Sequence, residues 1–341
     1  MENRILIDAI HIHSLGGKRL LEYLIKSINQ KKLLNNILFF FDKRLDLESN
    51  PLLKKCNFYK INPRISSRIL AYKRYSKDFN TIVCLSNIPP PYKIRDKIVY
   101  VYFHNLLLIQ SFSNELKDFI TNKLKKIYIK QKNIENYNWI VQTDYMKEQL
   151  SRSLLIKRSQ IEVLPFFDIT QFKKRKKFFN DSTINFLYVT SNLKHKNIEK
   201  LIRAFKSVTF QNKKTINLYI TVDGGDIFID KKRIFFVGNL DKNNLVKFYQ
   251  KTHYLIYPSF VESLGLPILE AIKSGCNVIV SEIPTFKSIC NPSLFINPNS
   301  VESIRESIEK AINVDYINQS NIVVKNKIDN FIELIFKNVQ K

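Results

Sequence analysis

The chain has 341 residues, of which 45% are hydrophobic, and this length suffices for one large core or two ordinary ones. No apolar run approaches the roughly 18 residues of a membrane-spanning helix. The charged residues Glu2, Arg4 and Asp8 interrupt the first apolar stretch, which is not typical of a signal peptide. We therefore expect a cytoplasmic protein.

The net charge of +25 has two explanations. A basic protein is attracted to nucleic acid or to anionic lipid, but a chain rich in Lys, Ile and Asn together is also what an A/T-rich coding sequence produces. The Lys and Arg residues are spread along the chain, and no basic motif with interleaved aromatic residues is present. A nucleic-acid-binding protein stays an alternative, and our main expectation is that nucleic acid is not a partner.

The four cysteines (Cys56, Cys84, Cys276 and Cys290) are scattered along the chain. They form no C-x-x-C pair, and no His lies at metal-ligand spacing from them. This pattern indicates reduced thiols and argues against a structural zinc site.

Strands and helices alternate in the first half of the chain. A strand at 4–10 precedes a polar loop, 11–17, and apolar residues at 20, 21, 24, 25 and 28 then recur at helical spacing. Further strands are predicted at 37–41, 81–85, 98–103, 139–142 and 161–164. This alternation indicates a mostly parallel α/β sheet of Rossmann type, and the absence of G-x-G-x-x-G disfavours a nicotinamide cofactor.

His104 and Asn105 directly follow the apolar strand predicted at 98–103. They therefore lie at the carboxyl edge of the sheet, where open α/β sheets bind ligands. A His in such a place is more often a polar cap than a catalyst, and the residues alone leave both readings open.

A helix is predicted at 113–132. Its apolar positions fall on one side, with Lys residues among the rest, which predicts an amphipathic helix packed on the core. A basic helix of this kind also suits contact with anionic lipid at the inner face of the plasma membrane. The apolar positions are Leu116, Phe119, Ile120, Leu124 and Ile127.

The polar, basic interval 171–182 (QFKKRKKFFNDS) predicts a linker, after which a second alternating series begins. A strand at 186–189 and a basic loop at 191–197 (SNLKHKN) lead into a helix that Asn197 is expected to cap. The other predicted elements are strands at 218–222, 234–237 and 294–296, and helices at 243–250, 301–312 and 322–339.

The most informative stretch is 254–282 (YLIYPSFVESLGLPILEAIKSGCNVIVSE). It predicts a strand at 255–257, a tight turn at 263–267, a helix from Pro267 to Lys273 closed by Gly275, and a strand at 277–280. Free amides and the positive helix end would suit a phosphate, and Glu262 and Glu270 bracket the turn. The alternative is a purely structural strand, turn and helix with an exposed Glu near the helix start.

This stretch resembles the signature of the retaining family 4 glycosyltransferases, with two Glu separated by seven residues, G-L-P between them and E-A next. The loop SNLKHKN similarly resembles the family's loop with a phosphate-binding Lys, although Ser191 stands where many members have Arg. The resemblance covers nearly the whole second half. In the first half it rests mainly on Gly16, Gly17 and the His104–Asn105 pair.

The resemblance implies a GT-B fold, in which two Rossmann-like α/β domains with mostly parallel sheets face each other across a cleft. The implied domains are an acceptor-side domain at 1–168, a linker at 169–183 and a nucleotide-sugar-binding domain at 184–316. A C-terminal helix within 317–341 is expected to cross back to the first domain.

By the same resemblance, Glu270 binds the ribose hydroxyls, Glu262 meets the donor sugar and Lys196 binds the phosphates. His104 is expected near the donor sugar, and Gly17 near the diphosphate. The other implied donor-binding positions are Ser191, Gly238, Asn239, Leu264, Gly265 and Leu266.

The implied activity is retaining, metal-independent transfer of a sugar from a UDP- or GDP-sugar to a glycan acceptor, lipid-linked, in bacterial cell-surface polysaccharide synthesis such as that of O-antigen or lipopolysaccharide. No D-x-D motif is present, because Asp223 and Asp226 flank glycines instead. We expect Glu262 to orient the sugar rather than act as a nucleophile. The alternatives are epimerase or phosphorylase chemistry on the same fold, or an inactive partner subunit.

Overall fold

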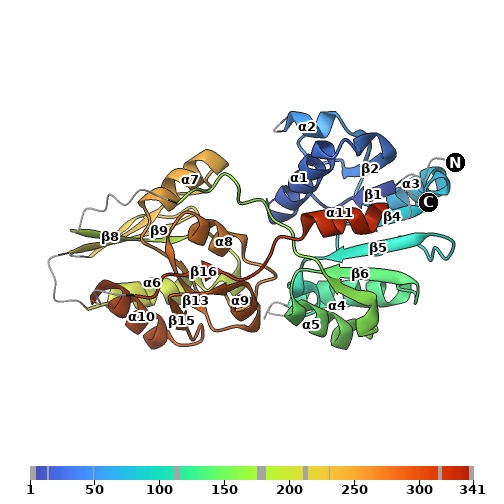
Figure 1. Ribbon diagram of the computed structural model, residues 1–341. Helices are drawn as coiled ribbons and strands as arrows, with labels where there is room; N and C mark the ends of the chain where they lie inside the picture. Colours follow the sequence, from blue (N-terminus) through green and yellow to red (C-terminus); the bar gives the residue numbers. More distant parts are fainter. Residues whose placement is uncertain are drawn as a thin grey trace. The chain divides into compact units, whose positions relative to one another are not determined.

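The computed structural model describes residues 5–13, 15–48, 50–110, 116–174, 182–209, 214–229, 231–313 and 317–337. The predicted helix start at Ser113 and most of the predicted linker lie outside these residues. The chain divides into two compact units: Met1–Asp168 with Lys325–Lys341, and Ile169–Val324. Each unit is an α/β domain built on its own sheet (Figure 1).

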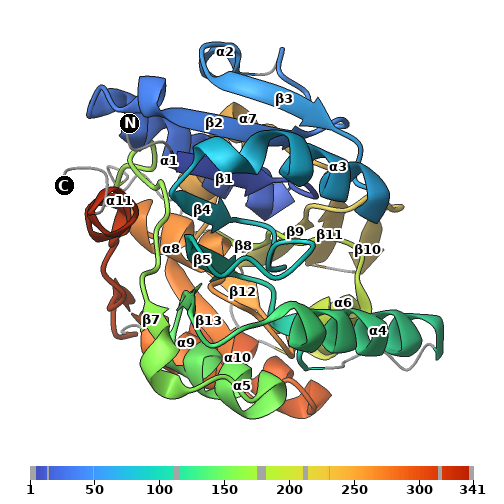
Figure 2. The ribbon, with the colours of Figure 1, turned by 90° about the vertical axis from the view of Figure 1, so that its right-hand side faces the viewer.

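In the described part of the first unit, seven parallel strands form one sheet in the order β3-β2-β1-β4-β5-β6-β7 (Figure 2). The strands are β1 (Ile5–Ala9), β2 (Ile37–Asp42), β3 (Asn57–Ile61), β4 (Thr81–Cys84), β5 (Ile98–Phe103), β6 (Tyr137–Val141) and β7 (Ile161–Val163). The α-helices are α1 (Leu15–Gln30), α2 (Pro51–Lys54), α3 (Ile65–Tyr75), α4 (Leu116–Lys132), α5 (Asp144–Leu154) and α11 (Ile328–Phe336). Short 3-10 helices are η1 (Leu34–Asn36), η2 (Ser76–Asp78), η3 (Leu106–Leu108) and η4 (Arg158–Gln160).

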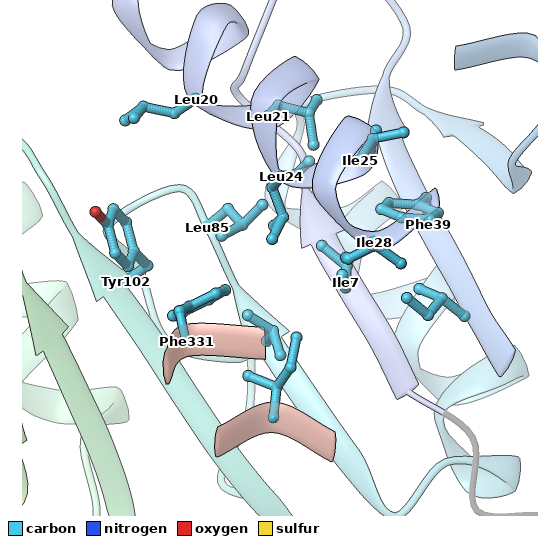
Figure 3. Packing of buried hydrophobic residues seen from close by; sticks show 14 of the residues in the cluster. Ile7, Leu20, Leu21, Leu24, Ile25, Ile28, Phe39, Leu85, Tyr102 and Phe331 are labelled. Atoms are coloured by element: carbon cyan, nitrogen blue, oxygen red, sulfur yellow. The ribbon is translucent and has the colours of Figure 1, made fainter. Parts of the chain in front are cut away.

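The core of the first unit lies between the sheet and two helices, α1 and α11. Alternate side chains of β1 and β2 point to this face, as the two-residue period of a strand requires, and α1 covers them with its apolar stripe (Figure 3). Phe331 of α11 is fully buried, with its ring centroid 5.6 Å from that of Tyr102 and 5.1 Å from that of Phe166. The C-terminal helix therefore completes the core of the first unit.

In the described part of the second unit, the main sheet has the order β10-β11-β9-β8-β12-β13-β15, and only β10 pairs in the antiparallel sense. Its strands are β8 (Thr183–Tyr188), β9 (Thr215–Ile220), β10 (Ile227–Ile229), β11 (Lys232–Phe236), β12 (Tyr254–Tyr257), β13 (Asn277–Ser281) and β15 (Leu294–Ile296). A small ladder joins β14 (Cys290–Asn291) to β16 (Asn321–Ile322). The helices are η5 (Lys194–Lys196), α6 (Ile198–Ser207), α7 (Lys242–Lys251), α8 (Leu266–Lys273), α9 (Pro284–Ile289) and α10 (Val301–Asn313).

Three expectations from the sequence are wrong. The loop predicted at 11–17 is shorter, because α1 begins at Leu15 and takes Gly16 and Gly17 into its first turn. The last helix begins at Ile328 rather than near 322, where Ile322 is instead paired in β16. On α4, Ile120, Leu124 and Ile127 are exposed rather than packed on the core; the side chains of Leu116 and Phe119 are not described.

Both sheets reverse their strand order beside the first strand of the unit. The chain runs from β1 outward through β2 and β3, then returns to place β4 on the other side of β1. In the second unit it runs from β8 outward through β9, then returns to place β12 on the other side of β8. Ligands of open α/β sheets bind outside the carboxyl ends of the strands at such a reversal. The fold therefore predicts ligand sites at the segments after β1 and β4 of the first unit, and at those after β8 and β12 of the second unit.

Candidate functional site

In the second unit, an ion pair joins the segments that follow β8 and β12. Nζ of Lys196, at the end of η5, lies 2.5 Å from Oε1 of Glu262, and each side chain is only 12% exposed. The ammonium also lies 5.5 Å from the ring centroid of Tyr257. Two of the residues predicted to bind the donor are thus brought together as partners of each other.

Backbone contacts hold both segments in place. Asn197 adopts a left-handed conformation with φ 61°, and its Nδ2 donates to the carbonyls of Pro258 (3.1 Å) and Pro298 (2.8 Å). The amide of Phe260 donates to the carbonyl of His195 at 2.9 Å. Asn197 occupies the N-cap position of α6, as expected, but its side chain makes no cap bond and instead joins the basic loop to the segment after β12.

Lys196, in the basic loop 191–197, contacts the segment that precedes the glycine turn through its ion pair with Glu262. His195 beside it is buried, and burial, followed by the nearby charge of Lys196, lowers the pKa of the imidazole to about 4. The ring is therefore neutral near pH 7. Lys194 is exposed and Ser191 is half-buried. Lys196 has its ammonium at the reversal of the strand order, where it pairs with Glu262.

The glycine turn before α8 has the conformation that its sequence predicts. Gly265 has φ 71°, and a Cβ there would lie 3.1 Å from Phe286 and 3.2 Å from Ile268. Leu264 before it is buried, and α8 starts at Leu266. The turn thus needs glycine for both its backbone angle and its space, and it starts a helix whose first amides and positive dipole end favour an anion.

Glu270 is fully buried within the second unit. Its Oε2 accepts a hydrogen bond of 2.9 Å from the hydroxyl of Tyr249 in α7, which also lies 3.2 Å from the carbonyl of Pro267. This excludes the alternative of an exposed Glu that only interacts with the helix dipole. It also means that a ribose reaches Glu270 only after the atoms that cover the carboxylate have moved.

The predicted base-binding residues follow β11. Gly238 has φ 64°, and a Cβ there would lie 3.0 Å from Oδ1 of Asp223, while Asn239 is exposed. Asp226 accepts a 2.9 Å hydrogen bond from the amide of Phe236. Within the described residues, no group of three His, Cys, Asp or Glu side chains is placed to hold a metal ion.

The first unit contains a cavity of about 630 Å³ at its own reversal point. Residues after β1, β4 and β5 line it, together with residues of α1, α3 and α4. Gly17 and His104 both contribute to the wall, and a Cβ on Gly17 would lie 3.8 Å from Cε1 of His104. These two predicted residues are therefore neighbours.

His104 is held by the loop after β4. Its amide donates to Oδ1 of Asn87 at 2.6 Å, and its Nε2 lies 3.0 Å from the carbonyl of Leu85. A carbonyl only accepts, so Nε2 carries the proton and Nδ1 is left as an acceptor. Burial lowers the pKa of His104 to about 4. The imidazole is therefore a neutral hydrogen-bonding group near pH 7.

Sequence reasoning missed the buried ion pair beside this cavity. Arg68 of α3 donates to Asp8 of β1 through Nε (2.8 Å) and Nη2 (2.7 Å), and Tyr72 donates to the same carboxylate at 2.7 Å. Nη1 of Arg68 donates to the carbonyl of Pro89 at 2.9 Å. The one signal in the sequence was a charged residue, Asp8, within an apolar strand. Because its donors bind protein acceptors, Arg68 positions the segments around the cavity.

The lowered pKa of His104 predicts a loss of stability in acid. In the folded chain His104 is protonated only near pH 4, whereas in the unfolded chain it is protonated near the ordinary pKa of 6.5. The free energy of unfolding is therefore highest above pH 6.5 and decreases as the pH falls toward 4. Between about pH 7.5 and pH 5, wild type should lose on the order of 2 kcal/mol more than His104→Gln. Urea unfolding followed by the fluorescence of Trp139, the single Trp and a buried residue of β6, reports on the first unit. Equal losses in both proteins would contradict the assignment.

Comparison with known proteins adds an independent line of evidence. Residues 169–328 match the family described as "Glycosyl transferases group 1". The O-antigen chain mannosyltransferase RfbU of Salmonella typhimurium is 24% identical over 269 residues, which cover 70% of this chain and 72% of that protein.

Solved structures show the same fold. Sucrose-phosphate synthase from Thermosynechococcus elongatus matches with a TM-score of 0.70 and 15% identity, over 99% of this chain and 96% of that one. The Anabaena protein HepE, solved in complex with UDP-glucose, matches with a TM-score of 0.64 and 11% identity, over 99% and 98%. The predicted fold class is confirmed: the chain has the GT-B fold, and the expected similarity to group 1 glycosyltransferases is confirmed over residues 169–328.

Proposed function

We propose that this chain is a retaining glycosyltransferase that moves a sugar from a UDP- or GDP-linked donor to a glycan acceptor during the synthesis of bacterial cell-surface polysaccharide. The observation that carries the proposal is the Lys196–Glu262 pair at the reversal point of the second sheet, next to the glycine turn that starts α8. This unit is also the one that matches the group 1 family.

The donor diphosphate becomes the leaving group, and its negative charge needs compensation. Lys196 supplies one positive charge, and the amides at the start of α8 supply oriented dipoles, near Leu264, Gly265 and Leu266. We assign the charge compensation to these groups, with no metal ion, as part of the proposal. Ser191 stays a donor-binding position in the same loop.

Glu262 is assigned to the hydroxyl groups of the donor sugar. It is already held by an ammonium in a partly buried place, which suits a carboxylate that orients a ligand by accepting hydrogen bonds. Retention of configuration then proceeds on one face of the sugar, with the leaving phosphate taking the proton of the acceptor hydroxyl. A glycosyl adduct on Glu262, detected by mass spectrometry, would contradict this role.

The remaining donor contacts follow from the neighbouring strand ends. Glu270 is assigned to the ribose, and Gly238 with Asn239 to the surface below the base. In the first unit, His104 is assigned to the sugar hydroxyls, because a neutral imidazole suits an uncharged polyol, and Gly17 to close approach of the diphosphate.

The similarity to RfbU supports a place in O-antigen or lipopolysaccharide synthesis, with a hexose such as mannose as the transferred sugar and a lipid-linked glycan as the acceptor. The nucleotide in HepE supports a UDP-sugar equally well as a candidate donor. The proposal therefore includes both uridine and guanosine donors, and the experiment below separates them.

A panel of UDP-, GDP-, ADP- and dTDP-sugars tests the proposed donor site. A ligand that binds only the folded chain raises its melting temperature, by an amount that grows with ligand concentration. We expect at least one UDP- or GDP-sugar to do so, and Lys196→Ala and Glu270→Gln each to weaken that binding by about tenfold or more. Sugar transfer with the same donor should fall in parallel.

The matched control for these variants is Lys287→Ala. Lys287 also pairs with a carboxylate of the second unit, that of Glu282 at 2.9 Å, but both side chains are more than half exposed. The Lys287→Ala variant should bind the donor as wild type does. A wild-type chain that no sugar nucleotide stabilises, or full activity in Lys196→Ala, would refute the proposed function.

We also propose peripheral contact with an anionic membrane through α4. This helix exposes Ile120 and Ile127 by 47% and 44%, and Lys123 and Lys125 on it are exposed as well. Apolar side chains flanked by Lys are the composition of helices that lie in a membrane interface. In the described part of the chain, no helix is long and apolar enough to span a bilayer.

Vesicle sedimentation tests this contact. The chain should bind vesicles with phosphatidylglycerol more strongly than vesicles of phosphatidylcholine alone, and the double variant Ile120→Ser/Ile127→Ser should lose most of that binding. Phe228→Ser removes an apolar side chain that is 63% exposed on β10 and serves as the control. Unchanged binding by the double variant would contradict a role for α4.

A further inference from the structure

Lys196 and Glu262 are bonded to each other, although the proposed donor contacts assign them to different parts of the ligand. We propose that this ion pair makes the donor site select the intact nucleotide sugar over the nucleoside diphosphate that remains after transfer. The inference rests on the proposed function, because it assigns Lys196 to the phosphates and Glu262 to the sugar.

First, placing a diphosphate at Lys196 has an unfavourable free-energy contribution. A phosphate at Lys196 either takes the ammonium away from Glu262 or shares it with that carboxylate. Both side chains are only 12% exposed, so a separated Glu262 would be a carboxylate with little water around it. A shared ammonium would hold two anions within a few ångströms of each other, which is unfavourable for the same reason.

The second step is the difference between substrate and product. An intact donor brings sugar hydroxyl groups, and these donate to the carboxylate that the diphosphate has displaced. A nucleoside diphosphate brings no such donors. Binding of the intact donor therefore exchanges one set of partners for another, while binding of the product takes the ammonium away from Glu262 and brings no new hydrogen-bond donor in its place.

The surroundings of the pair confine this exchange to the side chains. The carbonyl of Lys196 accepts a hydrogen bond of 2.5 Å from the hydroxyl of Tyr188, and the carbonyl of Glu262 accepts one of 2.9 Å from Thr285. With Asn197 and His195 also bonded to the segment after β12, the two backbones are fixed at this place. The pair thus separates by rotation of the side chains.

Tyr257 is the other polar group against the pair. Burial, followed by the charge of Glu262, raises the pKa of Tyr257 well above its ordinary value, so the phenol stays neutral. The phenol is hydrogen-bonded to Glu262, but a neutral donor does not replace the positive charge of Lys196 beside that carboxylate. The selectivity is therefore assigned to the carboxylate and to Lys196.

The consequence is a site that releases its product. Substrate and product share the base, the ribose and two phosphates, but the terminal phosphate of the product has one more negative charge, so contacts to Lys196 and to helix amides alone would favour the product. The Lys196–Glu262 pair weakens only the ligand that lacks the sugar. Glu262 is thus a specificity-determining residue in addition to its proposed contact with the sugar.

Calorimetric titration of the full chain tests the inference with two matched pairs of probes, UDP-glucose with UDP and GDP-mannose with GDP. The measured quantity is the ratio of the Kd of the nucleoside diphosphate to the Kd of its sugar nucleotide. In wild type this ratio should be well above one. In Glu262→Gln it should fall by about tenfold, mainly because the nucleoside diphosphate binds more tightly once Lys196 is released.

Two further variants give the result its meaning. In Glu282→Gln, which removes the exposed carboxylate paired with Lys287, the ratio should stay at the wild-type value. In Lys196→Gln/Glu262→Gln, the nucleoside diphosphate should bind no more tightly than in Lys196→Gln alone, since no ammonium is released. Glu262→Ala replaces Glu262→Gln if the latter does not fold.

Three outcomes would overturn the inference. The first is that Glu262→Gln binds the nucleoside diphosphate no more tightly than wild type does. The second is that the tighter binding persists without Lys196, and the third is that Glu282→Gln shows it equally. If wild type binds a sugar nucleotide and the ratio is the same in all variants, this inference fails and the proposed function stands. If wild type binds none of the four probes, the proposed function fails as well.

Discussion

The Lys196–Glu262 ion pair is the interaction on which the interpretation of this chain depends. It exists because β8 and β12 are neighbours in the sheet, which brings together segments 66 residues apart. The contacts of Asn197, Tyr188 and Thr285 then hold the two backbones at a distance that lets the side chains meet. A charged pair that is mostly shielded from water is costly to separate, so its position at the reversal of the strand order indicates a ligand that can replace both partners.

The two units use the same topology with different electrostatics. In the first unit, Asp8 and Arg68 form a buried pair whose remaining donors bind carbonyls of the loop after β4. That pair is bonded to protein groups, and it supports a cavity whose imidazole, His104, is neutral near pH 7. In the second unit, Lys196 pairs with Glu262, which lies in the segment before the helix that begins at Leu266. We therefore assign anion binding to the second unit as part of the proposed function.

Local rules were enough to predict much of the second unit. Pro267 at a helix start, Gly265 and Gly275 at positive φ, and the apolar strands on either side determine the strand, turn and helix from their own residues. The alternation of strands and helices also predicted two parallel sheets. In the first unit, β3 was missed, because this edge strand (NFYKI) alternates only weakly between buried and exposed positions.

The contacts that make the site could not be predicted in the same way. The pairing of Lys196 with Glu262, and of Arg68 with Asp8, depends on strand order, which no local pattern encodes. Asn is a common helix-capping residue, but the backbone of Asn197 is left-handed and its side-chain amide donates to the carbonyl of Pro258 instead. The place of Glu270 near a helix start is also compatible with an exposed side chain, but Tyr249 of α7 donates to its carboxylate, which is buried.

Hydrogen–deuterium exchange with a bound sugar nucleotide tests the central claim most directly, because it locates the ligand by residue. The account predicts slower exchange in two peptides of the second unit, those spanning 190–197 and 258–268, when a donor that stabilises the chain is added. Unchanged exchange in these two peptides, with protection of others in the presence of the same saturating donor, would contradict it.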